Sequence, residues 1–262
     1  MNRYGTNPKL DKLADSDNWE DRARVAEQGY ALDKLINDED YRVRRVVAEK
    51  GYGLDKLVND TAYEVRAAVA RQGYGLDKLV NDKYCSIRIV VAKQGYGLDI
   101  LIIDTDEYVR RAAYKYLTEH KYNSIFEWTK DNKIDIDINE WLHSSIWFKR
   151  REVAKFGYRL DILINDSDML IREIVMDYLK NHNYLSIFDW AKNNNVNLDI
   201  NEWLHSNEYI KRLEVVKAGY RLDVLINDRD MFIYNAVIEY LENHDYLSIA
   251  DWAKDNDIDI PY

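Results

Sequence analysis

The residue types that most often bind metals or transfer protons are present in this chain, but they follow its internal periodicity. His120, His182 and His244 are spaced 62 residues apart, and His143 and His205 have the same spacing. No two histidines have the i, i+4 spacing of a zinc-binding helix, and one cysteine cannot build a thiolate site. We therefore interpret the histidines as structural and expect neither a metal site nor a cofactor.

Nucleophilic and acid–base chemistry has no better support. Cys85 occupies the position that Tyr41 and Tyr63 hold in neighbouring repeats, which indicates a tolerated substitution rather than an activated thiol. The chain has no phosphate-binding glycine-rich loop, no G-x-S-x-G motif and no H-E-x-x-H motif. Its 47 Asp and Glu residues are too many for one pair to stand out as acid and base. We expect no catalytic residues and predict that the chain is not an enzyme.

The elements that carry these residues are internal repeats. Gly-Tyr pairs recur every 22 residues at 29–30, 51–52, 73–74 and 95–96, and again at 157–158 and 219–220 with a spacing of 62. Residues 105–166 and 167–228 share 34 identical positions out of 62, and a third copy begins at Arg229 and stops at Tyr262. The sequence thus combines a short unit of 22 residues with a long unit of 62.

Each short unit predicts two helices. Val43, Val46 and Val47 have helical spacing, Gly51 is a natural stop after them, and residues 54–58 present the apolar face of a second, shorter helix. Because such a unit cannot enclose a core alone, neighbouring units must stack. The predicted fold class is all-α, an α-solenoid of stacked short helical repeats with 22-residue units followed by 62-residue units. We expect short repeats over 1–104 and long-unit repeats over 105–262, continuous with the first set and truncated in the last copy.

The long unit inserts about 40 residues between such helix pairs. We expect the tryptophans that recur within it to form its core: Trp128, Trp190, Trp252, Trp141 and Trp203. Asn139 and Asn201 are placed to cap a short helix at its N-terminus. The alternating stretch 134–138 is predicted to be a connector, since no partner strand is visible.

An aspartate followed six residues later by an arginine recurs along the chain. The pairs are Asp38/Arg44, Asp60/Arg66, Asp82/Arg88, Asp104/Arg110 and Asp166/Arg172. This pattern resembles HEAT repeats and the related leucine-rich-repeat-variant family, over most of 7–117 and again at 157–179 and 219–241. The resemblance implies a structural ladder of Asp and Arg along the stack, and a concave face lined by the arginine-bearing helices. The sequence departs from the family at Tyr234, where arginine is expected, and at the inserts.

The charge distribution limits the classes of partner. Residues 1–104 carry 17 Lys and Arg against 18 Asp and Glu, whereas residues 105–262 carry 20 against 29. Direct binding of nucleic acid is not expected, because phosphates are neutralised by clustered cations. No stretch is apolar enough for a signal peptide or a membrane span, so we expect a cytoplasmic protein without membrane contact.

One candidate binding surface stands out on the predicted concave face. Its cations are Arg45, Arg71, Lys93, Arg111 and Lys115. The repeat pattern predicts that they occupy equivalent positions in consecutive units. The leading hypothesis is a non-catalytic scaffold that binds a protein partner through an extended solenoid surface. An alternative is a phage or mobile-element inhibitor of a bacterial defence nuclease, anti-CRISPR-like, whose acidic half mimics nucleic acid. A HEAT-like DNA glycosylase is a third, weaker possibility, because it rests on fold resemblance alone.

Overall fold

The computed structural model describes residues 7–259, and within this range the chain is helical and contains no β-strand. It divides into two compact units, Met1–Asp135 and Ile136–Tyr262. The first holds α1 (Pro8–Ala14), α2 (Trp19–Glu27), α3 (Leu32–Leu35), α4 (Tyr41–Glu49), α5 (Leu54–Leu57), α6 (Tyr63–Arg71), α7 (Leu76–Leu79), α8 (Cys85–Lys93), α9 (Leu98–Leu101), α10 (Glu107–Glu119) and α11 (Ile125–Asp131). The second holds α12 (Ile138–Leu142), α13 (Trp147–Phe156), α14 (Leu160–Leu163), α15 (Met169–Asn181), α16 (Ile187–Asn193), α17 (Ile200–Leu204), α18 (Tyr209–Lys217), α19 (Leu222–Leu225), α20 (Met231–Asn243) and α21 (Ile249–Asp255). The all-α prediction is confirmed.

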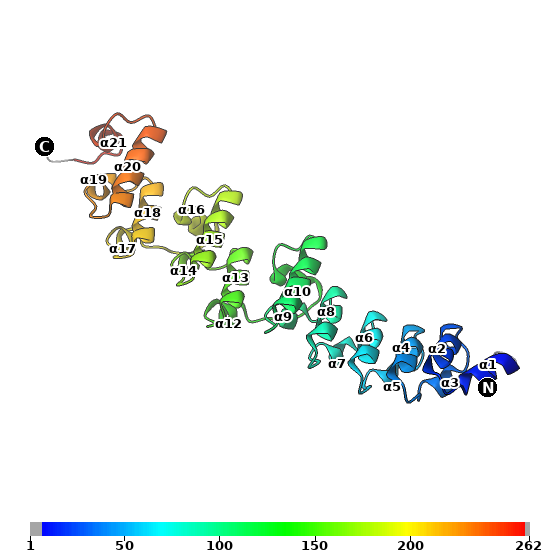
Figure 1. Cartoon of the computed structure of the whole chain (residues 1–262). Helices are drawn as coiled ribbons and strands as arrows, with labels where there is room; N and C mark the ends of the chain where they lie inside the picture. The colour runs from blue at the N-terminus through cyan, green and yellow to red at the C-terminus, as the bar shows by residue number, and fades with distance from the viewer. Residues whose placement is uncertain (1–6, 260–262) are drawn as a thin grey trace. The chain divides into compact units, whose positions relative to one another are not determined.

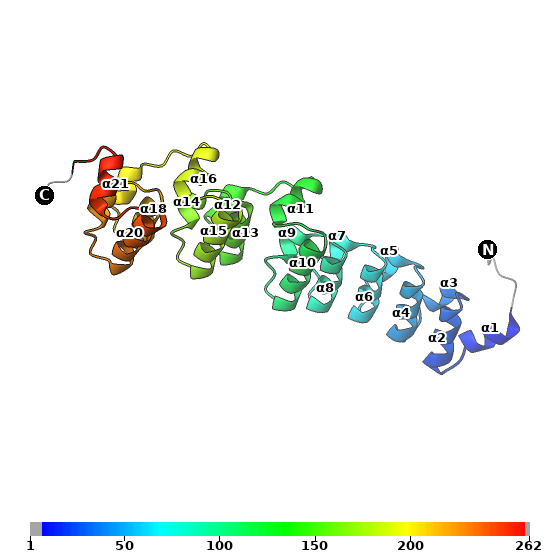
Figure 2. The same cartoon turned by 90° about the horizontal axis from the view of Figure 1, so that it is seen from above.

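In the first unit the longer helices pack in chain order, α2 on α4, α4 on α6, α6 on α8 and α8 on α10. The four-residue helices α3, α5, α7 and α9 each contact the longer helix before and the one after, and both views show them along one edge of the row (Figures 1 and 2). One buried side chain recurs at the same position of each longer helix: Val25, Val47, Val69, Val91 and Ala113. Neighbouring helices therefore share one apolar stripe.

The second unit repeats a larger arrangement. Helix α13 packs on α15 and α18 packs on α20, while the short helices α12 and α17 pack on α13 and α18. The inserted helices α16 and α21 contact α14 and α19. The core positions of the four longer helices are fully or almost fully buried: Val153, Val175, Val215 and Val237. Apolar burial thus joins α13 to α15 and α18 to α20.

Helix α4 shows how the sequence sets the boundaries of these elements. The side chain of Asp40 accepts a hydrogen bond from the backbone N–H of Arg42, which caps the start of the helix. Val43, Val46 and Val47 then point into the core on helical spacing. The chain leaves the helix at a positive φ of 71° in Gly51, a conformation that glycine adopts without steric cost. The predicted first helix of the short unit is confirmed.

The histidines of the first series have a packing role. His182 stacks on Tyr178 with ring centroids 3.9 Å apart, and its Nδ1 donates to the Tyr178 carbonyl at 2.8 Å. The Tyr178 ring in turn covers Gly157, where a Cβ would overlap its hydroxyl end. The 62-residue period thus preserves one contact set of glycine, tyrosine and histidine, which recurs at Gly219, Tyr240 and His244.

The tryptophans of the inserts are buried as predicted: Trp128, Trp141, Trp190, Trp203 and Trp252. The predicted caps Asn139 and Asn201, however, are wrong. Asp137 and Asp199 cap α12 and α17, since their carboxylates accept from the N–H groups two and three residues later. The amide of Asn139 instead accepts a hydrogen bond from the Tyr158 hydroxyl at 3.0 Å, and Asn201 does the same for Tyr220.

Candidate functional site

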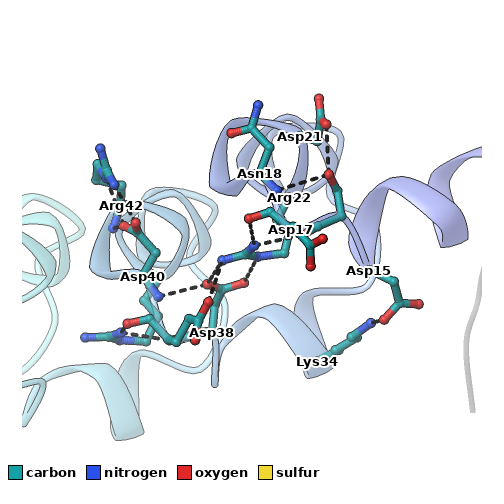
Figure 3. A network of polar contacts seen from close by, with 12 residues as sticks. Asp15, Asp17, Asn18, Asp21, Arg22, Lys34, Asp38, Asp40 and Arg42 are labelled. Carbon is teal, nitrogen blue, oxygen red and sulfur yellow. Dashed lines mark hydrogen bonds and ion pairs between the residues drawn. The ribbon is translucent and has the colours of Figure 1, made fainter.

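Each ladder arginine joins two consecutive repeats. The Nε and Nη2 atoms of Arg44 donate to the Asp60 carboxylate at 2.7 and 2.9 Å, and Nη1 donates to the Asp38 carbonyl at 2.7 Å. Both side chains are largely buried, with exposed fractions of 15% and 7%. Figure 3 shows the first such contact, between Arg22 and Asp38, with Asp40 and Arg42 beside it. The guanidinium thus bonds the carbonyl of its own unit and the carboxylate of the next.

The pairing spans 16 residues at every position where it occurs. The six side-chain pairs are Arg22–Asp38, Arg44–Asp60, Arg66–Asp82, Arg88–Asp104, Arg150–Asp166 and Arg212–Asp228. The sequence pattern pairs each aspartate with the arginine six residues later, and for Asp60 it leaves Arg66, Arg44 and Arg88 open as partners. In the structure the carboxylate binds the arginine sixteen residues before it, which is Arg44 for Asp60. Sequence reasoning missed Arg22, Arg150, Arg212 and Asp228. The signal was available, because six and sixteen add up to the short period of 22.

The ladder lowers the pKa of three of its carboxylates, those of Asp60, Asp82 and Asp166. Burial raises the pKa of Asp60, but hydrogen bonds from Arg44 and from the Ala62 N–H outweigh burial and leave the pKa below its usual range. The balance is the same for the pKa of Asp82 beside Arg66. These aspartates therefore stay ionised in the folded chain at a pH where unfolded aspartates already bind protons.

We expect acid to destabilise the chain through these aspartates. A pKa that is lower in the folded than in the unfolded state contributes stability above the unfolded value of about 3.9, and this contribution is lost as the pH falls through the folded pKa. The urea midpoint followed by circular dichroism should fall steeply below about pH 4. Asp60→Asn should make this fall shallower. An identical pH profile in that variant would show that Asp60 does not couple to folding.

The ladder is interrupted where the inserts begin. The residues sixteen positions after Arg110 and Arg172 are Phe126 and Phe188 instead of aspartate. Both arginines keep the bond to their own unit, from Nη1 to the carbonyls of Asp104 and Asp166. Within residues 7–259, no carboxylate lies within 4.0 Å of the Arg172 guanidinium, which is half-buried. In the pairs Asp104/Arg110 and Asp166/Arg172 the arginine thus donates to the backbone carbonyl of the aspartate.

In the second unit a buried glutamate provides a polar contact between consecutive repeats where the ladder is interrupted. Glu214 of α18 is fully buried at a register where α4, α6 and α8 have Val46, Ala68 and Val90. Its carboxylate accepts from the backbone N–H of Ile187 at 2.7 Å and from Lys217 Nζ at 2.6 Å. Ile187 is the first residue of α16, so Glu214 fixes the inserted helix to the next repeat. Sequence reasoning missed it, although a glutamate in an apolar register was a usable signal.

The five candidate cations do not form one row. Arg45 and Arg111 share one register, whereas Arg71, Lys93 and Lys115 share another, four residues later on the same helix face. Three of them form ion pairs with glutamates of their own helices: Arg45–Glu49 at 3.5 Å, Arg111–Glu107 at 2.6 Å and Lys115–Glu119 at 3.6 Å. Among the described residues Arg71 and Lys93 form no ion pair. The surface is therefore less basic than its cations suggest.

A second surface lies on the first turns of α15 and α20. Met169 and Leu170 are 60% and 51% exposed, and Met231 and Phe232, at the same positions 62 residues later, are 67% and 76% exposed. Large apolar side chains in solvent at two equivalent places are typical of an interaction surface. Sequence analysis did not single them out, because helical periodicity shows which residues face the core but not how exposed the others are.

A groove of about 770 Å³ adjoins this surface. Its walls are the turn before α15 with Arg172, the start of α18 with Tyr209 and Arg212, and the start of α20 with Arg229 and Met231. It combines apolar and charged side chains. It lies wholly in the second unit, at the interruption of the ladder.

The remaining observations are negative and apply to residues 7–259. No three His, Cys, Asp or Glu side chains come together there in a way that could hold a metal ion. None of the helices is both long and apolar enough to cross a membrane. Neither a scan against protein-family models nor a search of curated proteins finds a match to the chain.

Proposed function

We propose that this chain is a non-catalytic scaffold, an α-solenoid of HEAT-like repeats, that binds a protein partner. The observation that carries the proposal is the pair of exposed apolar turns, Met169 with Leu170 and Met231 with Phe232. Methionine and aromatic residues are enriched in protein interfaces, where a few buried anchor side chains carry most of the binding free energy. The ladder supports the proposal indirectly, since it fixes the register of helices that present the surface.

The cations Arg71 and Lys93 of the first unit are a separate candidate contact for the partner. Both are exposed, and neither is neutralised by an ion pair in the described chain. Charges at the rim of an interface act mainly on the association rate and are screened by salt. They would speed the association of an acidic partner segment with the first unit, more so at low salt.

A double variant, Met231→Ser with Phe232→Ser, tests this proposal. The full chain, immobilised, should capture a specific protein from a lysate of its native host, and the variant should capture at least about tenfold less, because a 1.4 kcal/mol loss is tenfold in affinity. The fold should survive, since both side chains are solvent-exposed at the first turn of α20. Quantitative mass spectrometry gives the readout.

Ile146→Ser is the matched control, because Ile146 is 43% exposed in the same unit, lies outside α15 and α20, and has a glutamate at the equivalent position 62 residues later. It should leave capture unchanged. An equal loss of captured protein in both variants would indicate non-specific adhesion. Unchanged capture in both variants would contradict the proposed surface. Reversing Arg71 and Lys93 to glutamate in the same experiment separates the cations from the apolar turns.

The charge of the second unit favours a second candidate function, inhibition of a bacterial defence nuclease by mimicry of nucleic acid. Residues 136–262 carry 14 Lys and Arg against 23 Asp and Glu. Six exposed carboxylates gather along α20, α21 and the turns beside them: Glu239, Glu242, Asp245, Asp251, Asp255 and Asp257. If the captured protein is a nuclease that DNA displaces from the chain, this candidate replaces the general scaffold.

A further inference from the structure

The contacts of Arg88 show which group a ladder arginine binds. At Arg88 the groove beside the helix is lined by Asn81, Asp82 and Lys83 on one side, and Asp104 comes from the other. The Asp104 carboxylate receives hydrogen bonds from Arg88 Nε at 2.6 Å and Nη2 at 2.8 Å. Nη1 meanwhile bonds the carbonyl of Asp82. This is a bidentate carboxylate site supplied by the next repeat.

The groove at Arg172 has the same first wall. Asn165, Asp166 and Ser167 stand where Asn81, Asp82 and Lys83 stand at Arg88, and Arg172 Nη1 bonds the Asp166 carbonyl in the same way. The second wall differs, because the start of α18 stands in place of a ladder aspartate and contributes Asn207, Glu208, Tyr209, Ile210 and Arg212. The groove is also larger, about 770 Å³ against about 420 Å³.

The carboxylates that line the Arg172 groove are engaged elsewhere. Asp166 pairs with Arg150, and Asp230 caps α20 by accepting from the Phe232 N–H. Glu208 lies 3.8 Å from Lys211, on its own helix.

The guanidinium groups in the groove are not all engaged in the same way. Arg212 is saturated by Asp228, whereas Arg229 makes one 3.3 Å hydrogen bond to the amide of Asn207. In the described chain Arg172 and Arg229 have no carboxylate partner. Three arginines and three carboxylates line the groove. With the ion pairs of Asp166, Glu208 and Arg212 set aside, Arg172 and Arg229 remain against Asp230, an excess of one positive charge in a unit that is acidic as a whole.

We propose that the Arg172 groove binds an acidic side chain of a peptide segment from the partner protein, which completes the interrupted ladder. The carboxylate occupies the place at Arg172 that Asp104 occupies at Arg88, and Arg229 adds a second cation. Tyr209 and Met231 in the groove wall provide apolar contact for the residues beside it. This inference rests on the proposed function, and it names the chemistry that the partner presents.

The experiment is a selection of random peptides displayed on phage against the immobilised full chain. Enriched peptides should carry Asp or Glu next to an apolar residue. A synthetic copy of an enriched peptide should bind the chain, and the same peptide with the acid replaced by its amide should bind about tenfold to a hundredfold more weakly, since a hydrogen bond to a charged group contributes about 1.5–3 kcal/mol. The amide comparison leaves the protein untouched.

Arg172→Gln should lower the affinity of the chain for the synthetic peptide by a similar factor. Arg172→Lys should retain part of that affinity, because lysine keeps the positive charge. Lys192→Gln, an exposed charge change on α16 away from the groove, should have no effect. Circular dichroism shows whether each variant is folded. If Arg172→Gln is unfolded, the comparison of the acid and amide peptides on the unmodified chain still tests whether the carboxylate is bound.

The inference would be overturned by any of three results. The selection enriches no peptide, the enriched peptides carry no carboxylate, or the affinity for the peptide is the same in Arg172→Gln as in the unmodified chain. Displacement of the peptide by a single-stranded oligonucleotide that itself binds in an Arg172-dependent way would assign the groove to nucleic acid instead. If the peptides fail while the lysate partner is still captured through Met231 and Phe232, only the groove assignment falls. If capture fails as well, the proposed function falls with it.

Discussion

Replacement of Trp190 by alanine is expected to lower the free energy of unfolding of the second unit by about 3–5 kcal/mol. The Trp190 side chain is only 1% exposed, and its indole N–H donates to the Gly157 carbonyl at 3.2 Å. The substitution removes a large apolar side chain, opens a cavity between α14 and α16, and leaves a buried carbonyl without its donor. Urea denaturation followed by circular dichroism measures the loss.

Two further variants make this result specific. Trp190→Phe keeps most of the ring but not the N–H, so it should cost clearly less than alanine. Leu185→Ala, at a side chain 79% exposed just before α16, should change the free energy of unfolding by no more than about 0.5 kcal/mol. Hydrogen exchange should accelerate in 187–193 of Trp190→Ala. A Trp190→Ala chain as stable as Leu185→Ala would show that the insert is not anchored through this residue.

Asp60→Ala is expected to cost about 1–3 kcal/mol of unfolding free energy, because it leaves a largely buried guanidinium without its counter-charge. Three hydrogen bonds are lost, two from Arg44 and one from the Ala62 N–H at 2.9 Å. The last of these positions the start of α6. Stability is measured by urea denaturation, and helical content by circular dichroism.

Asp77→Ala is the matched control, since Asp77 is an exposed aspartate on a short helix and belongs to no ladder pair. It should shift stability by less than about 0.5 kcal/mol. In the double variant Arg44→Leu with Asp60→Ala, the cost should be smaller than the sum of the single costs, because no charge is left unpaired. Additive costs, or an Asp60→Ala chain no less stable than Asp77→Ala, would contradict a coupled ladder.

The helices, and the side chains they bury, could be predicted from the sequence. Val43, Val46 and Val47 define a buried face of α4 because helical periodicity is a local property of the chain. The structural role of His120, His182 and His244 could be predicted in the same way, since they recur at one position of the repeat and each stacks on a tyrosine of its own helix. The recurring Asp and Arg were recognised as a ladder for the same reason.

Partners across repeats were decided by the tertiary structure. Asp60 binds Arg44 and not the side chain of Arg66, because stacking brings the end of one unit against the helix of the unit before it. The interrupted ladder at Arg172, the buried Glu214 and the exposed turn at Met231 and Phe232 depend on where the inserts dock. Sequence spacing fixes which residues share a helix face, whereas the distance between faces follows from packing, and side-chain pairing and exposure follow from that distance.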